Sequence, residues 1–265
     1  MKSVRRAMTI AGSDSGAGAG VQADLKTFAA LGVYGTSVIT AITAQNTLRV
    51  TRVLELPTDI IAAQMDAVMS DIGTDAAKTG MLASSQIIGV VAERTRALSI
   101  PNLVVDPVMV AKSGDRLLRE DAVQALRDEL LPLATVVTPN IPEAEVLVGY
   151  PLESMDDTHK AAREIAGMGA ANVVIKGGHR PGPVIDVLFS QGIVREFRSP
   201  RVESESTHGT GCTFASAVAA YLALGRSVEQ AVYHAKEYVT EAIKAAFPLG
   251  TGHGPVHHFY RFWGE

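Results

Sequence analysis

The chain reads AMTIAGSDSGAGAGVQADLKTFAAL from residue 7 to residue 31, and this stretch indicates the fold class. Residues 7–11 form a short apolar run typical of a buried strand, and residues 21–31 form a longer segment of helical period. The glycine-rich residues 12–20 join the two. Because this order of strand, turn and helix recurs along the chain, the sequence predicts an α/β fold with a largely parallel sheet.

The same alternation sets the other expected elements. Expected strands are residues 7–11, 37–43, 76–79, 103–106, 135–138, 172–175, 184–188 and 193–197, the last two forming a hairpin. Expected helices are residues 21–31, 60–70, 85–98, 121–131, 142–148, 157–168, 210–224 and 228–246. In open α/β sheets ligands bind beyond the carboxyl ends of the strands, so polar residues just after strands are the candidates for a site.

Length and composition indicate one compact domain. The chain has 265 residues, is 47% hydrophobic and contains no obvious linker, which predicts a single domain over residues 1–265. Its net charge is -4 and its 24 basic residues are dispersed, so nucleic acid is not an expected partner. The one cysteine suits a reducing compartment, and no segment approaches the roughly 20 apolar residues that span a bilayer. We therefore expect a cytoplasmic protein without membrane contact.

A glycine turn at residues 207–215, with the sequence THGTGCTFA, leads directly into an apolar helical pattern. The first N–H groups of a helix lack intrahelical partners and carry partial positive charge, so they can hold a phosphate. Glycine at positions 209 and 211 lets the backbone approach closely. Gly209, Thr210, Gly211 and Cys212 are therefore candidates for phosphoryl transfer. An ordinary glycine turn without a ligand explains the motif equally well when it is considered alone.

Further polar residues follow other expected strands. Asn140 and Glu143 offer oxygen ligands of the kind that Mg²⁺ prefers, and Asp106 can help to position the ion. Lys176 can neutralise nucleotide phosphates. The alternative for Asn140 and Glu143 is a helix N-terminus that an acidic residue stabilises through the helix dipole. The alternative for Asp106 and Lys176 is a surface charge at a turn. The glycine-rich residues 12–20 match neither the dinucleotide-binding nor the P-loop spacing.

Three histidines near the carboxyl terminus also suggest a metal site. His253, His257 and His258 lie close together, but glycine and proline interrupt their spacing and no acidic ligand is adjacent. A packed tail, or one that contacts a second copy of the chain, is the preferred interpretation.

Several ordered motifs carry a resemblance to one family. They are residues 11–18 (AGSDSGAG), 22–27 (QADLKT), 44–47 (AQNT), 138–140 (TPN), 176–179 (KGGH) and 208–212 (HGTGC). With them the whole chain resembles the hydroxymethylpyrimidine and phosphomethylpyrimidine kinases of thiamine biosynthesis, in the ribokinase-like superfamily. The resemblance implies a three-layer α/β/α fold with a mostly parallel central sheet, Mg²⁺ and ATP as the donor system, and a homodimer. It also implies successive phosphorylation of 4-amino-5-hydroxymethyl-2-methylpyrimidine and its monophosphate.

The resemblance further implies roles for single residues. Gly12, Gln45, Met81 and Val108 would line the pyrimidine pocket, while residues 209–212 would stand at the transferred phosphate. The amide of Gln45 can pair with a ring nitrogen and an exocyclic amine together, although a buried amide satisfied by backbone is the alternative. Core packing explains lone apolar residues equally well. Lys112 is a candidate for a loop that closes over phosphate, with a solvated loop lysine as its alternative.

Cys212 stands where the superfamily leads us to expect an aspartate base. A thiol at a helix N-terminus can have a lowered pKa and act as a base, but nearby ATP phosphates would oppose its ionisation. A phosphate monoester, in contrast, is already ionised near neutral pH and needs little base assistance, and an aspartate would repel it. We therefore interpret the cysteine as an adaptation that admits phosphate acceptors, as well as a candidate base for the alcohol.

Two other functions fit the same residues. A pyridoxal or pyridoxine kinase phosphorylates a hydroxymethyl group on a similar ring, and turnover of both substrates would separate the two kinases. A non-catalytic nucleotide or pyrimidine sensor would bind ligands without forming ADP.

Overall fold

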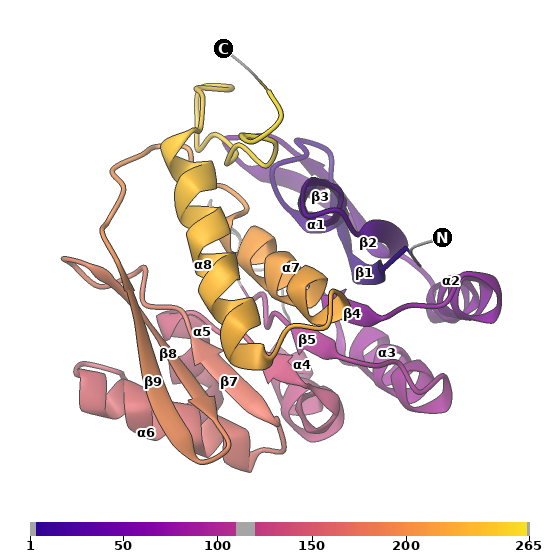
Figure 1. Cartoon of the computed structure of the whole chain (residues 1–265). Coiled ribbons are helices and arrows are strands. Elements are labelled where there is room, and N and C mark those ends of the chain that lie inside the picture. The colour runs from indigo at the N-terminus through magenta and orange to yellow at the C-terminus, as the bar shows by residue number, and fades with distance from the viewer. Residues whose placement is uncertain (1–3, 110–119, 264–265) are drawn as a thin grey trace.

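The computed structural model describes residues 4–109 and 120–263 of the chain. Within these residues a nine-stranded sheet has the order β3-β2-β1-β4-β5-β6-β7-β8-β9 (Figure 1). The strands are β1 (Arg6–Asp14), β2 (Tyr34–Gln45), β3 (Val50–Glu55), β4 (Ala76–Thr79), β5 (Leu103–Val105), β6 (Val136–Val137), β7 (Asn172–Ile175), β8 (Val184–Ser190) and β9 (Ile193–Ser199).

The central strands run parallel, and the antiparallel strands stand at the two sides. The run from β2 through β1, β4, β5 and β6 to β7 is parallel, whereas β3 pairs with β2 and β8 with β7 in antiparallel register. β8 and β9 form the expected hairpin, whose turn residues Gln191 and Gly192 have φ of 51° and 79°. Positive φ at both positions suits the twist of a two-residue hairpin. The prediction of a mostly parallel sheet is confirmed.

Helices cover both faces of this sheet (Figure 1). One face carries α1 (Gly20–Ala30), α7 (Thr210–Ala223) and α8 (Val228–Lys244). The other carries α2 (Thr58–Asp71), α3 (Ser85–Ala97), α4 (Glu120–Ala125), α5 (Ile141–Val148) and α6 (Met155–Gly167). Val104 of β5 packs against the layer of α1, α7 and α8, and Val105, one residue later, packs against the layer of α2 to α6. The two side chains separate in this way because successive strand side chains point to opposite faces. The expected three-layer α/β/α arrangement is confirmed.

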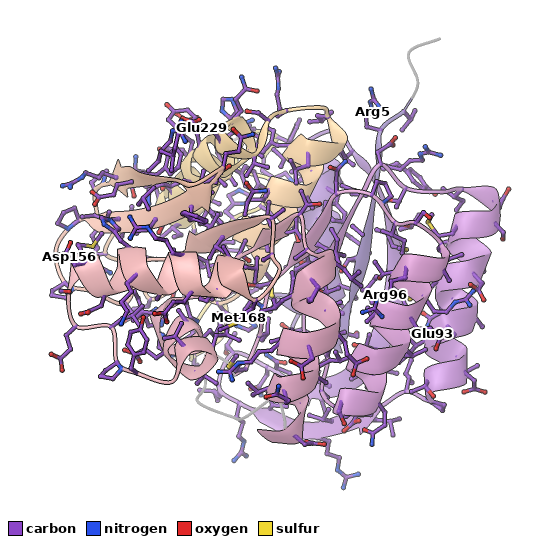
Figure 2. The ribbon with its side chains drawn as sticks, turned by 90° about the horizontal axis from the view of Figure 1, so that it is seen from below. Arg5, Glu93, Arg96, Asp156, Met168 and Glu229 are labelled. Carbon is purple, nitrogen blue, oxygen red and sulfur yellow. The ribbon has the colours of Figure 1, made fainter. Side chains whose placement is uncertain are left out.

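The outer surfaces of the helices are polar. Figure 2 shows Glu93 and Arg96 on α3 and Asp156 on α6, all exposed to solvent on the side away from the sheet. Among residues 4–109 and 120–263, no helix is both long enough and apolar enough to cross a membrane.

Two elements differ from the expectation, each for a physical reason. β3 was not expected, because most of its side chains are exposed and it is held by backbone pairing with β2 rather than by an apolar face. The expected helix over residues 121–131 ends early, since α4 gives way to a π-helical turn (Leu126–Leu130) and a 3₁₀ turn (Leu131–Leu133). Pro132 in the second turn cannot donate a helical hydrogen bond, which explains the break.

Candidate active site

One cavity of about 880 Å³ lies at the carboxyl ends of the parallel strands. Residues at or just after the ends of β1, β2, β5, β6 and β7 form its wall together with the start of α7. The predicted site residues that line it are Gly12, Gln45, Met81, Asp106, Val108, Asn140, Glu143, Lys176, Gly209, Thr210, Gly211 and Cys212. The structure therefore brings together the predicted site residues apart from Lys112, which lies outside the described residues.

The start of α7 presents backbone to the cavity. Its N-cap, Gly209, has a φ of 78° and no side chain that could cap the first turn. The Thr210 N–H donates to the Thr207 carbonyl oxygen at 3.3 Å, so the N–H groups of Gly211 and Cys212 are the ones that remain for an anion. A Cβ on Gly209 would lie 1.8 Å from the carbonyl oxygen of Gly18, which excludes any other residue without movement of the backbone. A Cβ on Gly211 would lie 3.3 Å from Lys176 Nζ and 4.0 Å from Asp106 Oδ2. The helix start thus stands beside these two charged groups.

Lys176, Asp106 and Glu143 form a cluster of charges in this wall. Lys176 Nζ lies 2.8 Å from Asp106 Oδ1, to which Thr138 Oγ1 also donates at 3.2 Å. Burial lowers the pKa of Lys176, but the Asp106 and Glu143 carboxylates outweigh it and raise that pKa above its usual value. Burial raises the pKa of Glu143 to about 7, with Lys176 opposing the shift and Asp106 adding to it. Because the two carboxylates of Asp106 and Glu143 face only the Lys176 ammonium here, the cluster has an excess of negative charge that favours binding of a further cation.

Asn140 and Glu143 also form the cap of α5. Asn140 Oδ1 accepts the Glu143 backbone N–H at 2.9 Å, and Glu143 Oε2 accepts the Asn140 backbone N–H at 2.8 Å. In the described part of the chain, no group of three or more His, Cys, Asp or Glu side chains is placed to hold a metal ion. The Asp106 and Glu143 carboxylates nevertheless suit a hydrated Mg²⁺, which needs only one or two carboxylates beside water and phosphate oxygens.

Cys212 is half-buried in the first turn of α7. Burial raises the pKa of its thiol to about 11, with Lys78 lowering that pKa and Asp24 and Asp106 raising it. Of the two directions considered for the pKa of this thiol, the structure supports the raised one, because loss of water and two carboxylates outweigh the nearby ammonium. Cys212 is a thiol rather than a thiolate at neutral pH.

A buried ion pair behind Cys212 was missed in the sequence. Lys78 Nζ lies 2.9 Å and 3.0 Å from the two carboxylate oxygens of Asp24, and both side chains are 0% exposed. Thr9 and Ser216 each donate a hydroxyl hydrogen to Asp24 at 2.6 Å. These contacts join β1, β4, α1 and α7. The available signal was a lysine inside the otherwise uncharged strand at residues 76–79.

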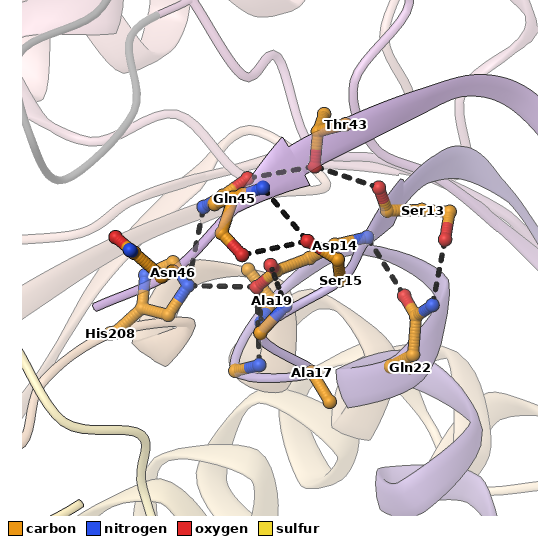
Figure 3. Close-up of polar contacts among 12 residues, drawn as sticks. Ser13, Asp14, Ser15, Ala17, Ala19, Gln22, Thr43, Gln45, Asn46 and His208 are labelled. Atoms are coloured by element: carbon orange, nitrogen blue, oxygen red, sulfur yellow. Dashed lines mark hydrogen bonds and ion pairs between the residues drawn. The ribbon is translucent and has the colours of Figure 1, made fainter. Parts of the chain in front are cut away.

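Figure 3 shows a second group that the sequence reasoning left without a role. The carboxylate of Asp14 accepts three backbone N–H groups from residues 16–19 at 2.8 to 3.1 Å, and Nε2 of His208 lies 2.9 Å from it. Burial raises the pKa of Asp14, but the hydrogen bonds from His208 and the backbone outweigh it and lower that pKa. The ring of His208 in turn lies 3.4 Å from the amide of Gln45. Asp14 and His208 stand within the motifs quoted above, which was the only signal.

Of the three carboxyl-terminal histidines, His257 and His258 are packed, whereas His253 is exposed and lines the cavity. His258 Nε2 lies 3.0 Å from Thr213 Oγ1 on α7, and its side chain is buried. The ring of His257 lies 5.1 Å from that of Phe247 and 4.9 Å from that of Trp263. These contacts account for the positions of His257 and His258.

The fold and the site together define a class. A mostly parallel sheet between two helical layers, with a glycine-rich helix start, a lysine and carboxylates at one edge, is the arrangement of a ribokinase-like kinase. Residues 14–257 match the family described as phosphomethylpyrimidine kinase. The chain belongs to that family.

Similar proteins agree with this assignment. The chain is 52% identical over 252 residues to a thiamine biosynthesis bifunctional protein of Geobacter sulfurreducens, covering 95% of this chain and 51% of that protein, so it spans about half of that relative. It is 47% identical over 259 residues to the hydroxymethylpyrimidine/phosphomethylpyrimidine kinase of Bacillus subtilis, covering 97% and 96%. The solved ADP complex of Bacillus subtilis pyridoxal kinase is also similar, with a TM-score of 0.90, 44% identity, and coverage of 97% of this chain and 98% of that chain.

Proposed function

We propose that this chain transfers the terminal phosphoryl group of ATP to 4-amino-5-hydroxymethyl-2-methylpyrimidine and then to the resulting monophosphate. The observation that carries the proposal is the single cavity that Gln45 and the glycine start of α7 both line. One end offers an amide for an aminopyrimidine, and the other offers helix N–H groups for a phosphoryl group. Family membership and the relative named for this activity support the choice of acceptor.

The acceptor end combines one amide with an apolar wall. The donor and acceptor of the Gln45 amide match a ring nitrogen and the neighbouring amine. A Cβ on Gly12 would lie 3.2 Å from Met81 Sδ, so glycine keeps this part of the pocket open for a flat ring. Val108 lines the same cavity and provides further apolar contact.

The transfer end supplies positive charge. The N–H groups of Gly211 and Cys212 at the start of α7 and the Lys176 ammonium would stabilise the charge that spreads over the transferred group, since phosphoryl transfer depends on positioning and electrostatics. The raised pKa of Lys176, which burial opposes and two carboxylates cause, keeps the ammonium charged at neutral pH. Bound Mg²⁺ supplies neutralisation of the nucleotide phosphates. Asp106 and Glu143 would hold that ion, and Asn140 would support Glu143 through the cap of α5.

Cys212 suits two different acceptors. Its pKa, raised to about 11 by burial despite the opposing effect of Lys78, leaves an uncharged thiol beside the reacting groups. An uncharged side chain does not repel the monophosphate, whose own oxygen is already ionised and nucleophilic at neutral pH. The second phosphorylation thus needs no base from the protein.

A coupled assay of ADP release tests the function directly. The aminopyrimidine alcohol, its monophosphate and pyridoxine are supplied separately with Mg²⁺ and ATP, and we expect turnover of both pyrimidines to exceed that of pyridoxine. The similarity to the pyridoxal kinase of Bacillus subtilis makes pyridoxine kinase the second candidate, which faster turnover of pyridoxine would favour. Tight ligand binding without ADP formation would instead favour a sensor.

We further propose that the enzyme is a cytoplasmic homodimer. The resemblance to the family supports the dimer, and the exposed apolar side chains Ile42 and Leu54, which pair across β2 and β3 on one face, offer a surface for it. The single cysteine supports a reducing compartment. Sedimentation equilibrium should give twice the chain mass, and a monomer at assay concentration would contradict the dimer.

A further inference from the structure

A line of side-chain contacts runs from the end of β1 into the pocket around Gln45 (Figure 3). Asp14 Oδ2 lies 2.9 Å from His208 Nε2, which lies 3.4 Å from Nε2 of the Gln45 amide. The amide oxygen lies 3.2 Å from Thr43 Oγ1, and Thr43 Oγ1 lies 2.9 Å from the carbonyl oxygen of Ser13. Both ends of the amide are therefore in contact with groups whose hydrogen-bonding roles can be worked out.

The role of His208 follows from its partner. The Asp14 carboxylate already accepts three backbone N–H groups, so it acts as an acceptor and His208 Nε2 must carry a hydrogen. That one hydrogen is donated to Asp14, so the contact with Gln45 at 3.4 Å is only a weak second share of the same N–H, and it favours the amide oxygen over the amide nitrogen. With the amide nitrogen in that place, two N–H groups would face each other.

The role of Thr43 gives the same answer independently. A threonine hydroxyl has one hydrogen, and the Ser13 carbonyl oxygen accepts it at 2.9 Å because a carbonyl cannot donate. Thr43 Oγ1 can then only accept from Gln45. A half-turn of the amide exchanges its oxygen and nitrogen within nearly the same outline. It gives Thr43 Oγ1 a donor, and it replaces the contact between two nitrogen donors at His208 with a weak contact to an acceptor.

We propose that His208, oriented by Asp14, and Thr43 lock the Gln45 amide with its oxygen toward His208 and its nitrogen toward Thr43, and so determine the specificity of the pocket. This inference rests on the proposed function. His208 and Thr43 are positioning residues, since they act through Gln45. The free edge of the amide then offers an N–H donor on the Thr43 side and an oxygen acceptor on the His208 side.

This order of donor and acceptor fixes the direction of the bound ring. A 4-aminopyrimidine pairs with its ring nitrogen on the Thr43 side and its amine on the His208 side. The reacting hydroxymethyl group is on the carbon next to the amine-bearing carbon, so it extends past His208. Gly209, the N-cap of α7, follows His208 in the chain. The locked amide therefore aims the hydroxyl at the phosphoryl-transfer end, and the opposite amide orientation would aim it away.

A matched pair of acceptors tests the lock. In the 4-oxo analogue of the substrate the ring nitrogen carries a hydrogen and the exocyclic oxygen accepts one, which reverses the order of donor and acceptor. A locked amide rejects this compound because polar groups are left unpaired, whereas an amide that turns freely can accept either. For the wild type we expect kcat/KM to favour the amino compound by about 100-fold or more.

Variants of His208 and Thr43 distinguish a loss of positioning of the Gln45 amide from a general loss of activity. His208→Ala and Thr43→Val should each reduce the ratio of kcat/KM values for amino and oxo acceptors by about tenfold or more, while the KM for ATP stays nearly unchanged. His208→Gln keeps an N–H donor near the position of Nε2, and Thr43→Ser keeps the hydroxyl, so both should restore most of the ratio. His159→Ala is the matched control, because His159 Nε2 also contacts a carboxylate, Glu196 Oε1 at 3.1 Å, but does not line the cavity.

The outcomes are decisive at each step. A ratio that stays at the wild-type value in His208→Ala and in Thr43→Val overturns the lock while leaving the proposed function intact. If the wild type phosphorylates no pyrimidine, the proposed function itself fails. Nitrogen-15 NMR of labelled histidine gives a readout independent of turnover and of folding of the variants: the wild-type His208 ring should carry its hydrogen on Nε2, and a bare Nε2 overturns the inference.

Discussion

At the scale of the residue, Cys212 stands where opposing influences meet. The start of α7 and the ammonium of Lys78 favour a thiolate, whereas burial, Asp24 and Asp106 disfavour it and prevail, which raises the thiol pKa to about 11. The position in the sequence shows the helix start but not the loss of water or the carboxylates, which come from distant parts of the chain. An uncharged side chain in the wall of the cavity is the result.

Charge at this position should discriminate between the two acceptors. In Cys212→Asp we expect kcat/KM for the monophosphate to fall at least about tenfold more than for the alcohol, because a like charge at close range costs on the order of 1 to 4 kcal/mol. Cys212→Ser is the uncharged control and should affect both acceptors equally. Steady-state kinetics measure the effect, and equal losses for both acceptors in Cys212→Asp would contradict the role.

Gly211 gives a prediction in which activity and stability separate. A methyl group there would lie 3.3 Å from Lys176 Nζ, so Gly211→Ala should displace the ammonium and lower kcat by about tenfold. The thermal unfolding midpoint should stay or rise, because alanine favours a helix over glycine by about 1 kcal/mol. Gly167→Ala in α6 is the matched control, since a Cβ there meets nothing within 4 Å. An unchanged kcat in Gly211→Ala would rule out this arrangement.

At the scale of the element, the buried pair of Lys78 and Asp24 joins two helices to two strands. Asp24 on α1 receives hydroxyl hydrogens from β1 and α7 as well as the ammonium from β4. The donors leave neither carboxylate oxygen without a partner, which a charge removed from water requires. The pair therefore holds the layer of α1 and α7 in register with the sheet.

Removal of one partner should be more harmful than removal of both. Lys78→Met leaves the Asp24 charge buried without its ammonium, so we expect a loss of about 3–5 kcal/mol in the free energy of unfolding. The double variant Lys78→Met with Asp24→Leu should be more stable than Lys78→Met alone. Urea denaturation of the single and double variants measures this, and a double variant less stable than either single variant would contradict the account.

Helices and strands whose apolar residues recur at regular spacing could be predicted from the sequence. Elements and contacts that are stabilised mainly by backbone pairing or by distant polar partners could not. The parallel strands and the hairpin of β8 and β9 follow from alternating apolar runs, and strand ends correctly indicated which residues gather at the cavity. β3 escaped prediction because backbone pairing with β2 holds it. The contact between Asp14 and His208 also escaped, because it spans 194 positions and no local pattern encodes it. The order of strands and motifs in the sequence thus predicted which residues line the cavity. It did not predict the distant side chains that determine their charge and hydrogen bonding.

At the scale of the whole molecule, the carboxyl-terminal segment seals one side of the helical layer. His258 lies against Thr213 of α7, and its backbone oxygen accepts a hydrogen bond from Tyr238 of α8 at 2.7 Å. Burial lowers the pKa of His258 to about 3, and Lys26 and His257 add to the shift. A buried neutral histidine of this kind couples the packing of the segment to pH.

Acid should weaken the protein through this histidine. The pKa of His258 is lowered by burial to about 3, below its ordinary value of 6.5, so its contribution to stability is complete above pH 6.5 and is lost progressively as the pH falls toward 3. Between pH 6.5 and pH 5 the loss should be about 2 kcal/mol. His258→Gln keeps an acceptor for Thr213 but cannot titrate, so its stability should decline less. Urea denaturation of the wild type and of His258→Gln at pH 6.5 and pH 5 measures the difference. Equal losses of stability in the two proteins would contradict this role of His258.

The packing of Gly18 against Gly209 has a consequence for folding during translation. A Cβ on Gly209 would overlap the carbonyl oxygen of Gly18, so the two turns fit together only as bare backbone, although most of the polypeptide separates them. Translation delivers the first turn early and the second late, and such distant contacts form only after the intervening chain is available. A nascent chain therefore cannot complete this contact between the two turns until Gly209 has emerged from the ribosome.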